Sequence, residues 1–143
     1  MEDEKNELTL KKLELAKQYL EDAKKDLKKA RIDKRANRYI HSNYVSSACE
    51  KAYLGALEAL KALFIYKNSI SENEMEKIKE FYRGLKEMED LGEIRDLLLG
   101  LFDDVYNILH LGSYYGELQN KKAIDSGFEK VKKIIKIVEN YVK

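Results

Sequence analysis

The stretch that decides the fold is residues 44–64, YVSSACEKAYLGALEALKALF. Its apolar residues recur every three or four positions, which is the spacing of one face of an α-helix. That face consists of Val45, Ala48, Ala52, Ala56, Ala59 and Leu63. Because small side chains let a neighbouring backbone approach closely, we predict that this segment is the central helix of a bundle.

The segments on either side also carry helical periodicity, and proline is absent from all 143 residues. We predict helices over about residues 4–34, from near 37 or 42 to 66, from 71 to about 90–92, from 92 to the 112–116 window, and from 120 to 142. The sequence Ser71-Glu72-Asn73-Glu74 reads as a capping box before the third helix. No segment alternates with period two for long enough to predict a strand.

The apolar positions that define these faces fall on both sides of the central stretch. On the first helix they are Leu13, Ala16, Leu20, Ala23, Leu27 and Ala30; on the fourth Ile94, Leu97, Leu98, Leu101, Val105, Ile108 and Leu109; on the last Ile124, Phe128, Val131, Ile135, Val138 and Val142. Gly127 within the last helix indicates either close packing or a frayed first turn. Short connections favour antiparallel neighbours. We therefore predict an all-α fold, a single domain over residues 1–143, as an antiparallel up-and-down four-helix bundle with one additional shorter helix.

Composition excludes several classes of protein. The single cysteine, Cys49, has no disulfide or zinc partner, and we expect it to be a buried apolar side chain. The acidic start has no secretory signal pattern, and no stretch is apolar enough for a membrane span. Metal-ligand spacings and nucleotide-binding glycine motifs are missing, so we expect no metal and no cofactor. These observations predict a cytoplasmic protein that does not contact a membrane.

Charge is uneven although the chain carries a formal net charge of only +1. Residues 11–38 hold eleven bases and five acids, a net charge of +6, whereas residues 72–104 hold eleven acids and five bases, a net charge of −6. One interpretation is that these are solvated faces that attract one another within the fold. The other is that a basic patch near residues 24–38 meets phosphate or an acidic partner.

Two stretches carry a family resemblance: residues 44–64, and residues 106–111 (YNILHL) followed by Tyr114-Tyr115-Gly116. With the helix order they resemble the HEPN superfamily (higher eukaryotes and prokaryotes nucleotide-binding), and more closely a small bacterial HEPN-like family without an assigned function. The resemblance implies an antiparallel bundle, frequent homodimers and, in many members, metal-independent RNA cleavage. It also implies a nucleotidyltransferase as a possible protein partner.

Cleaving members of that superfamily carry an arginine, four to six further residues and a histidine near the start of a late helix. Before His110, the positions for that arginine are Asp103, Asp104 and Val105, and the two acids would repel a scissile phosphate. We therefore expect no ribonuclease action at His110. A second match to the spacing, Arg35 with His41, lies at the turn between the first two helices, where Arg38 adds a further base.

A polar cluster on the late helix is the other candidate site. Asn107 and His110 are three residues apart and Tyr114 is four further on, so the spacing places all three on one helix face. His110 has a structural interpretation, a partly buried ring bonded to a tyrosine or carboxylate, and a functional one, a ligand groove or dimer seam. Ten tyrosines in the chain also suit an interface, or ordinary boundary packing.

We therefore expect a non-catalytic interaction or binding module that forms a homodimer. The alternative is an RNA-cleaving or nucleotide-modifying protein of a toxin–antitoxin type system that uses Arg35, Arg38 and His41. Nucleic acid is then the partner.

Overall fold

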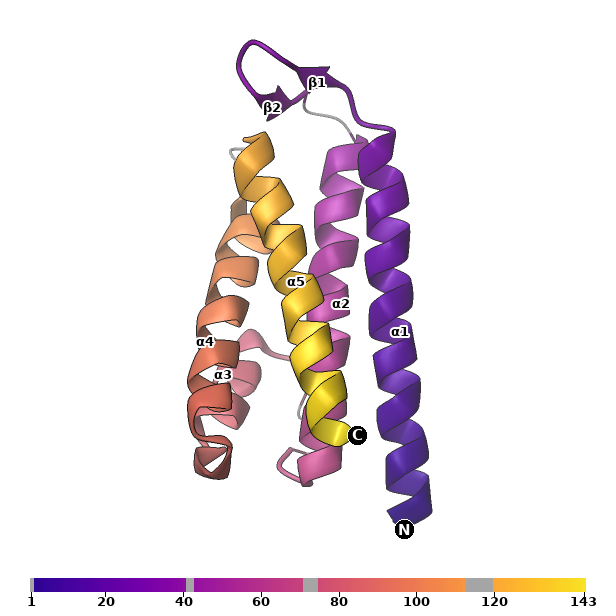
Figure 1. Ribbon diagram of the computed structural model, residues 1–143, viewed down its shortest axis with the longest axis vertical. Helices are drawn as coiled ribbons and strands as arrows, with labels where there is room; N and C mark the ends of the chain where they lie inside the picture. Colours follow the sequence, from indigo (N-terminus) through magenta and orange to yellow (C-terminus); the bar gives the residue numbers. More distant parts are fainter. Residues whose placement is uncertain (1, 41–42, 71–74, 113–119) are drawn as a thin grey trace.

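Five α-helices form the body of the protein, for which a computed structural model describes residues 2–40, 43–70, 75–112 and 120–143. They are α1 (Glu2–Lys28), α2 (Asn43–Lys67), α3 (Ile78–Lys86), α4 (Glu93–Val105) and α5 (Lys121–Val142). In Figure 1, α1 and α4 rise from the lower end, α2 and α5 return to it, and the short α3 lies beside α4. The predicted antiparallel four-helix bundle with an additional shorter helix is confirmed. No helix in the described ranges is long and apolar enough to cross a membrane.

The pairing of α1 with α2 rests on small side chains. Ala16 and Ala23 of α1 and Ala52 and Ala56 of α2 have no exposed surface. A Cβ atom added to Gly55 of α2 would lie 3.1 Å from the backbone carbonyl oxygen of Ala16, so the two backbones approach closely. Since α2 also contacts α4, α5 and the segment after α4, the prediction of a central second helix is confirmed.

Larger side chains fill the other side of α2. The rings of Phe64 in α2, Phe81 in α3 and Phe102 in α4 follow one another, with centroids 5.8 Å and 6.0 Å apart. All three are buried, as are Leu98 of α4 and Ile134 of α5. The short third helix therefore closes one end of the core that α2, α4 and α5 share.

The first connection differs from the prediction. Helix α1 ends at Lys28 instead of continuing to residue 34, and strands β1 (Ile32–Asp33) and β2 (Arg38–Tyr39) form an antiparallel hairpin. An Asp33 carboxylate oxygen accepts hydrogen bonds from the backbone N–H groups of residues 35 and 36, at 3.1 and 3.2 Å, and Asn37 has a positive φ of 51°. These contacts form the turn that reverses the chain between the two strands. A two-residue strand is too short to produce an alternating pattern, and so it was missed.

Two further expectations about helices are wrong. The third helix begins at Ile78, several residues after the proposed capping box, which lies outside the described residues. On α4, Ile94 and Leu97 are exposed, with 37% and 53% of their surface accessible, although both were assigned to the apolar face. Leucines are so frequent in α4 that two overlapping stripes satisfy the helical period, and only packing distinguishes them.

Candidate functional site

His110 lies at the contact between α2 and the end of the fourth helix. Its Nδ1 atom is 3.2 Å from Oε2 of Glu50. The imidazole stacks on the Tyr53 ring, with centroids 4.4 Å apart and planes 23° apart, and on the Tyr106 ring, at 5.4 Å and 28°. The side chains of His110 and Glu50 keep 30% and 45% of their surface accessible. The histidine is therefore stacked and paired but still reachable from solvent.

The aromatic contacts continue to α3. Tyr82 meets Tyr106 edge-on, with centroids 6.4 Å apart, and its hydroxyl donates to Asp103 at 2.8 Å. We call Glu50, Tyr53, Tyr82, Asp103, Tyr106 and His110 the His110 cluster. Burial is the main reason that the pKa values of Tyr53 and Tyr82 are raised well above the ordinary value, so both hydroxyls stay protonated at neutral pH.

A change of helix type positions His110. Helix α4 continues directly into a π-helix over Tyr106–Gly112, in which the wider turn changes which side chains share a face. Leu109 is fully buried there, and a Cβ atom on Gly127 of α5 would lie only 2.8 Å from its Cδ2 atom. Gly127 therefore marks close packing, the first of its two interpretations. With Leu109 fixed inside, the next residue, His110, meets α2.

The structure describes two of the three residues of the predicted polar cluster, Asn107 and His110, and gives them different partners. The Asn107 amide nitrogen donates to the Asp103 carbonyl oxygen of its own helix at 2.9 Å, and the side chain is exposed. Tyr114 lies outside the described residues. His110 contacts Glu50 and Tyr53 of α2, which come far earlier in the chain, as well as Tyr106 of its own helix. Their only sequence signal was polar character within an alanine-rich helix.

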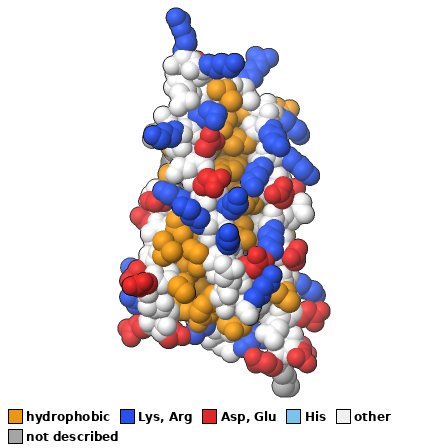
Figure 2. Space-filling model, in the orientation of Figure 1, with side chains coloured by type: hydrophobic (Ala, Val, Ile, Leu, Met, Phe, Trp, Pro, Cys, Tyr) orange, Lys and Arg blue, Asp and Glu red, His pale blue; other side chains and the backbone are white. Residues whose placement is uncertain are grey.

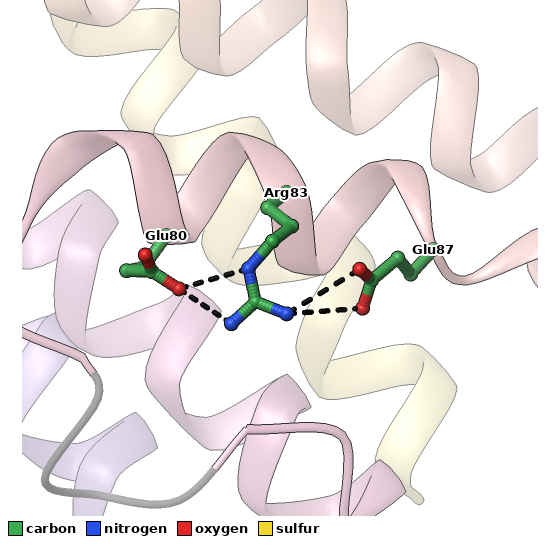
Figure 3. Close-up of polar contacts among 3 residues, drawn as sticks. All are labelled: Glu80, Arg83 and Glu87. Atoms are coloured by element: carbon green, nitrogen blue, oxygen red, sulfur yellow. Dashed lines mark hydrogen bonds and ion pairs between the residues drawn. The ribbon is translucent and has the colours of Figure 1, made fainter.

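The charged groups around the cluster are mainly acidic. Glu50 and Asp103 belong to it, and the neighbouring Asp104 pairs with Lys130 of α5 at 2.7 Å. Arg83, next to Tyr82 in the chain, is held between two carboxylates of its own helix, those of Glu80 and Glu87 (Figure 3). The hydrogen bond to Glu80 is the main cause of a raised pKa at Arg83. The carboxylates of the cluster therefore disfavour a phosphodiester, which is also negatively charged.

Metal binding finds no support in the described part of the chain, where no three histidine, cysteine or acidic side chains are grouped to hold an ion. Cys49 is fully buried, as expected. The second candidate set lies on the hairpin. Arg35 and Arg38 are exposed, and the Nε atom of Arg38 is 3.9 Å from an Asp33 oxygen. His41 falls outside the described residues.

The two oppositely charged segments do not face each other. In Figure 1, α1 and α4 lie on opposite sides of the bundle. Ion pairs join α1 to α2 and α5 instead: Lys12 to Glu58 at 3.3 Å, Asp26 to Lys51 at 2.7 Å, and Lys17 to Glu139. The expectation that these segments attract one another within the fold is therefore wrong. Figure 2 shows Lys and Arg side chains gathered at the upper end of one face and acids at the lower end.

The fold defines a small all-α protein, a helical bundle with one additional short helix. The chain belongs to the family described as a domain of unknown function, DUF5618, whose model matches residues 11–140. A protein of unknown function from Dyadobacter fermentans is similar in structure, with 28% identity, a TM-score of 0.72, and coverage of 93% of this chain and 98% of that one.

A crystal structure of a Sulfolobus solfataricus protein has a TM-score of 0.68 at 23% identity, covering 90% of this chain and 96% of that one, and shows the fold alone. No curated protein matches this chain.

Proposed function

We propose that this protein is a non-catalytic binding module with a HEPN-like bundle, and that the His110 cluster is its interaction surface. The observation that carries the proposal is the partly exposed His110 ring, which stacks on the buried Tyr53 and on Tyr106 and has the Glu50 carboxylate beside it. Stacked rings with polar edges supply rigid contact area at small entropic expense, which is why tyrosine is enriched at protein interfaces.

The first partner we propose is a second copy of the chain. The cluster contains two carboxylates, those of Glu50 and Asp103, and Asp103 belongs to the acidic segment of residues 72–104. The basic segment of residues 11–38, with its net charge of +6, has the complementary character. Such complementarity speeds association and fixes the orientation of two surfaces more than it adds affinity. Within one protomer the basic segment and the acidic cluster lie apart. In a homodimer joined near the His110 cluster, the basic segment of one protomer would meet the carboxylates of the other.

RNA cleavage at His110 is disfavoured by the same surroundings. A histidine that cleaves RNA needs a cation to hold the phosphate. The positions for that cation are occupied by Asp103, Asp104 and Val105. Tyr82 donates to Asp103 and Lys130 pairs with Asp104, so both acids have fixed partners beside the π-helix.

Light scattering on the purified protein tests the homodimer. We expect the mass of two chains at tens of micromolar, and a monomer mass there would reject the proposal. Incubation of the same sample with total RNA should leave the RNA intact. Cleavage that is lost in His110→Ala would contradict a non-catalytic role.

A second function is favoured by the exposed arginines of the hairpin, Arg35 and Arg38. In this alternative the protein is an RNA-cleaving or nucleotide-modifying member of a toxin–antitoxin pair, acting in the cytoplasm with His41. Expression of the wild type and of His41→Ala in a bacterial host separates the two functions. Equal growth and intact RNA in both strains would remove the alternative. A nucleotidyltransferase encoded next to this chain would support it.

A further inference from the structure

We infer that a pocket between α1, the hairpin and α5 binds an amphiphilic anion, a small molecule with an apolar body and a carboxylate, sulfonate or phosphate head. The pocket has a volume of about 450 Å³ and is separate from the His110 cluster. Pockets of roughly 300–1,000 Å³ are the usual size for small-molecule sites. The inference does not rest on the function proposed above, although the pocket borders the same basic segment.

The floor of the pocket is apolar. It is formed by Leu27 and Ala30 at the end of α1 and by Ile32 and Tyr39 of the hairpin. Ile32 keeps 42% of its surface accessible. Tyr39 is buried and is held in place because its hydroxyl donates to Asp125 of α5 at 2.5 Å. A ligand with an apolar body would remove this exposed isoleucine from water, whereas an inorganic ion would not.

The rim of the pocket is cationic. Lys28 is exposed and makes no ion pair within the described ranges, and Lys24 meets Glu21 only at 3.6 Å. Lys121 is anchored by Asp125 at 2.6 Å and lies over the Tyr39 ring, 5.9 Å from its centroid. Two lysines one helical turn apart are thus available for an anionic head, and the third closes the opposite wall.

The wider surface has the same character. Figure 2 shows a strip of hydrophobic side chains between Lys and Arg side chains over the upper part of the molecule. The hairpin adds Arg35 and Arg38, so an approaching anion is attracted before it reaches the pocket. A neutral lipid would gain no ion pair at the basic rim, and an inorganic anion would gain no contact with the apolar floor, so both should bind more weakly than a ligand with both parts. The pocket therefore selects amphiphilic anions.

Titration of the ¹⁵N-labelled full chain with monomeric decanoate tests the inference. We expect amide shifts concentrated at residues 24–39 and at the start of α5. Decanol keeps the apolar chain but lacks the anionic head, and inorganic phosphate keeps the charge but lacks the apolar chain. Each should bind at least about tenfold more weakly than decanoate, since loss of either contact removes more than about 1.4 kcal/mol of binding free energy.

Two exposed positions allow safe variants with matched controls. Lys28→Gln should weaken decanoate binding about threefold, because it removes an ion pair with the head group. Ile32→Ser should weaken it about tenfold, because it removes an apolar contact. Lys86→Gln on α3 and Leu97→Ser on α4 change similarly exposed side chains elsewhere and should leave binding unchanged. Circular dichroism confirms that each variant is folded.

Three results would overturn the inference: shifts spread over the whole bundle, equal effects of the control variants, or phosphate binding as tight as decanoate. Phosphatidylglycerol vesicles distinguish a lipid surface from a free ligand. Binding to vesicles without binding of monomeric decanoate would contradict the pocket. His110→Ala should leave decanoate binding intact, so failure here and failure of the interaction surface are distinguishable.

Discussion

Helix α2 has two very different neighbours. Toward α1 it presents alanines and Gly55, whose missing Cβ lets the Ala16 carbonyl approach to within contact distance. Toward the π-helix it presents Tyr53 and Glu50, which meet the half-exposed His110. Small apolar side chains at helical spacing make the first contact. The second combines ring stacking with a carboxylate–imidazole pair at a π-helix.

The difference teaches which contacts a periodic pattern can predict. Close packing of α1 on α2 needs only small residues at helical spacing, and any chain with that spacing presents the same face. The contact of α2 with His110 depends on which polar side chain of one helix meets which ring of another. Local spacing contains no information about that pairing.

The largest effect that we predict distinguishes the two faces of α4. Leu98 is fully buried and its neighbour Leu97 is 53% exposed. Leu98→Ala should lower the free energy of unfolding by about 2–5 kcal/mol, because it leaves a cavity in the core. Leu97→Ala should change it by no more than about 0.5 kcal/mol. Urea unfolding of both variants checks this, and similar losses would mean that the inward face of α4 is misassigned.

The contact between α1 and α2 can be disrupted by adding volume. Ala52 has no exposed surface. Ala52→Leu should cost about 1–3 kcal/mol of stability, because the new side chain has no space between closely approaching helices. Lys11→Leu adds a leucine where 72% of the lysine side chain is accessible, and it is the control. If thermal unfolding of Ala52→Leu occurs at the wild-type temperature, Ala52 does not face a neighbouring helix.

The His110 side should respond to alkaline pH. The pKa values of Tyr53 and Tyr82 are raised in the folded protein, chiefly by burial, so folding favours their neutral forms. Their contribution to stability is complete below the unfolded pKa of about 10 and is lost as pH rises from there toward the folded pKa. We expect Tyr53→Phe with Tyr82→Phe to flatten the alkaline fall in unfolding free energy. An unchanged slope would contradict the burial of these hydroxyls.

The hydrogen bonds of Asp26 at the border of the α1–α2 contact should make the free energy of unfolding depend on acidic pH. We expect this effect to be smaller than that of the two tyrosines at alkaline pH. Hydrogen bonds from Lys51, and then from Ser47, lower the pKa of Asp26. That contribution is present above the unfolded pKa of about 4 and is lost as pH falls through the lower folded value. Asp26→Asn should reduce the acid dependence of unfolding by less than about 1 kcal/mol, as partly exposed pairs do. Glu14→Gln, an exposed acid on the same helix, is the control.

The sequence therefore predicted the helices and their order better than the site. Buried stripes such as Leu13 to Ala23 are set by local spacing, and the structure contains them. The hairpin was missed because each of its strands has only two residues, with Ile32 paired to Tyr39 and Asp33 to Arg38. Strands this short show no alternating pattern. The π-helix and the Glu50 partner of His110 were missed because both depend on packing between distant segments.

The central claim is that the His110 cluster forms an interaction surface and is not part of the core. Sedimentation equilibrium and urea unfolding of His110→Ala test it most directly when both are measured on one preparation. The account predicts at least about tenfold weaker self-association and a loss of no more than about 1 kcal/mol in protomer stability, since the side chain is partly exposed. A wild-type association constant together with a loss of about 2 kcal/mol or more would make His110 a structural residue and contradict the claim.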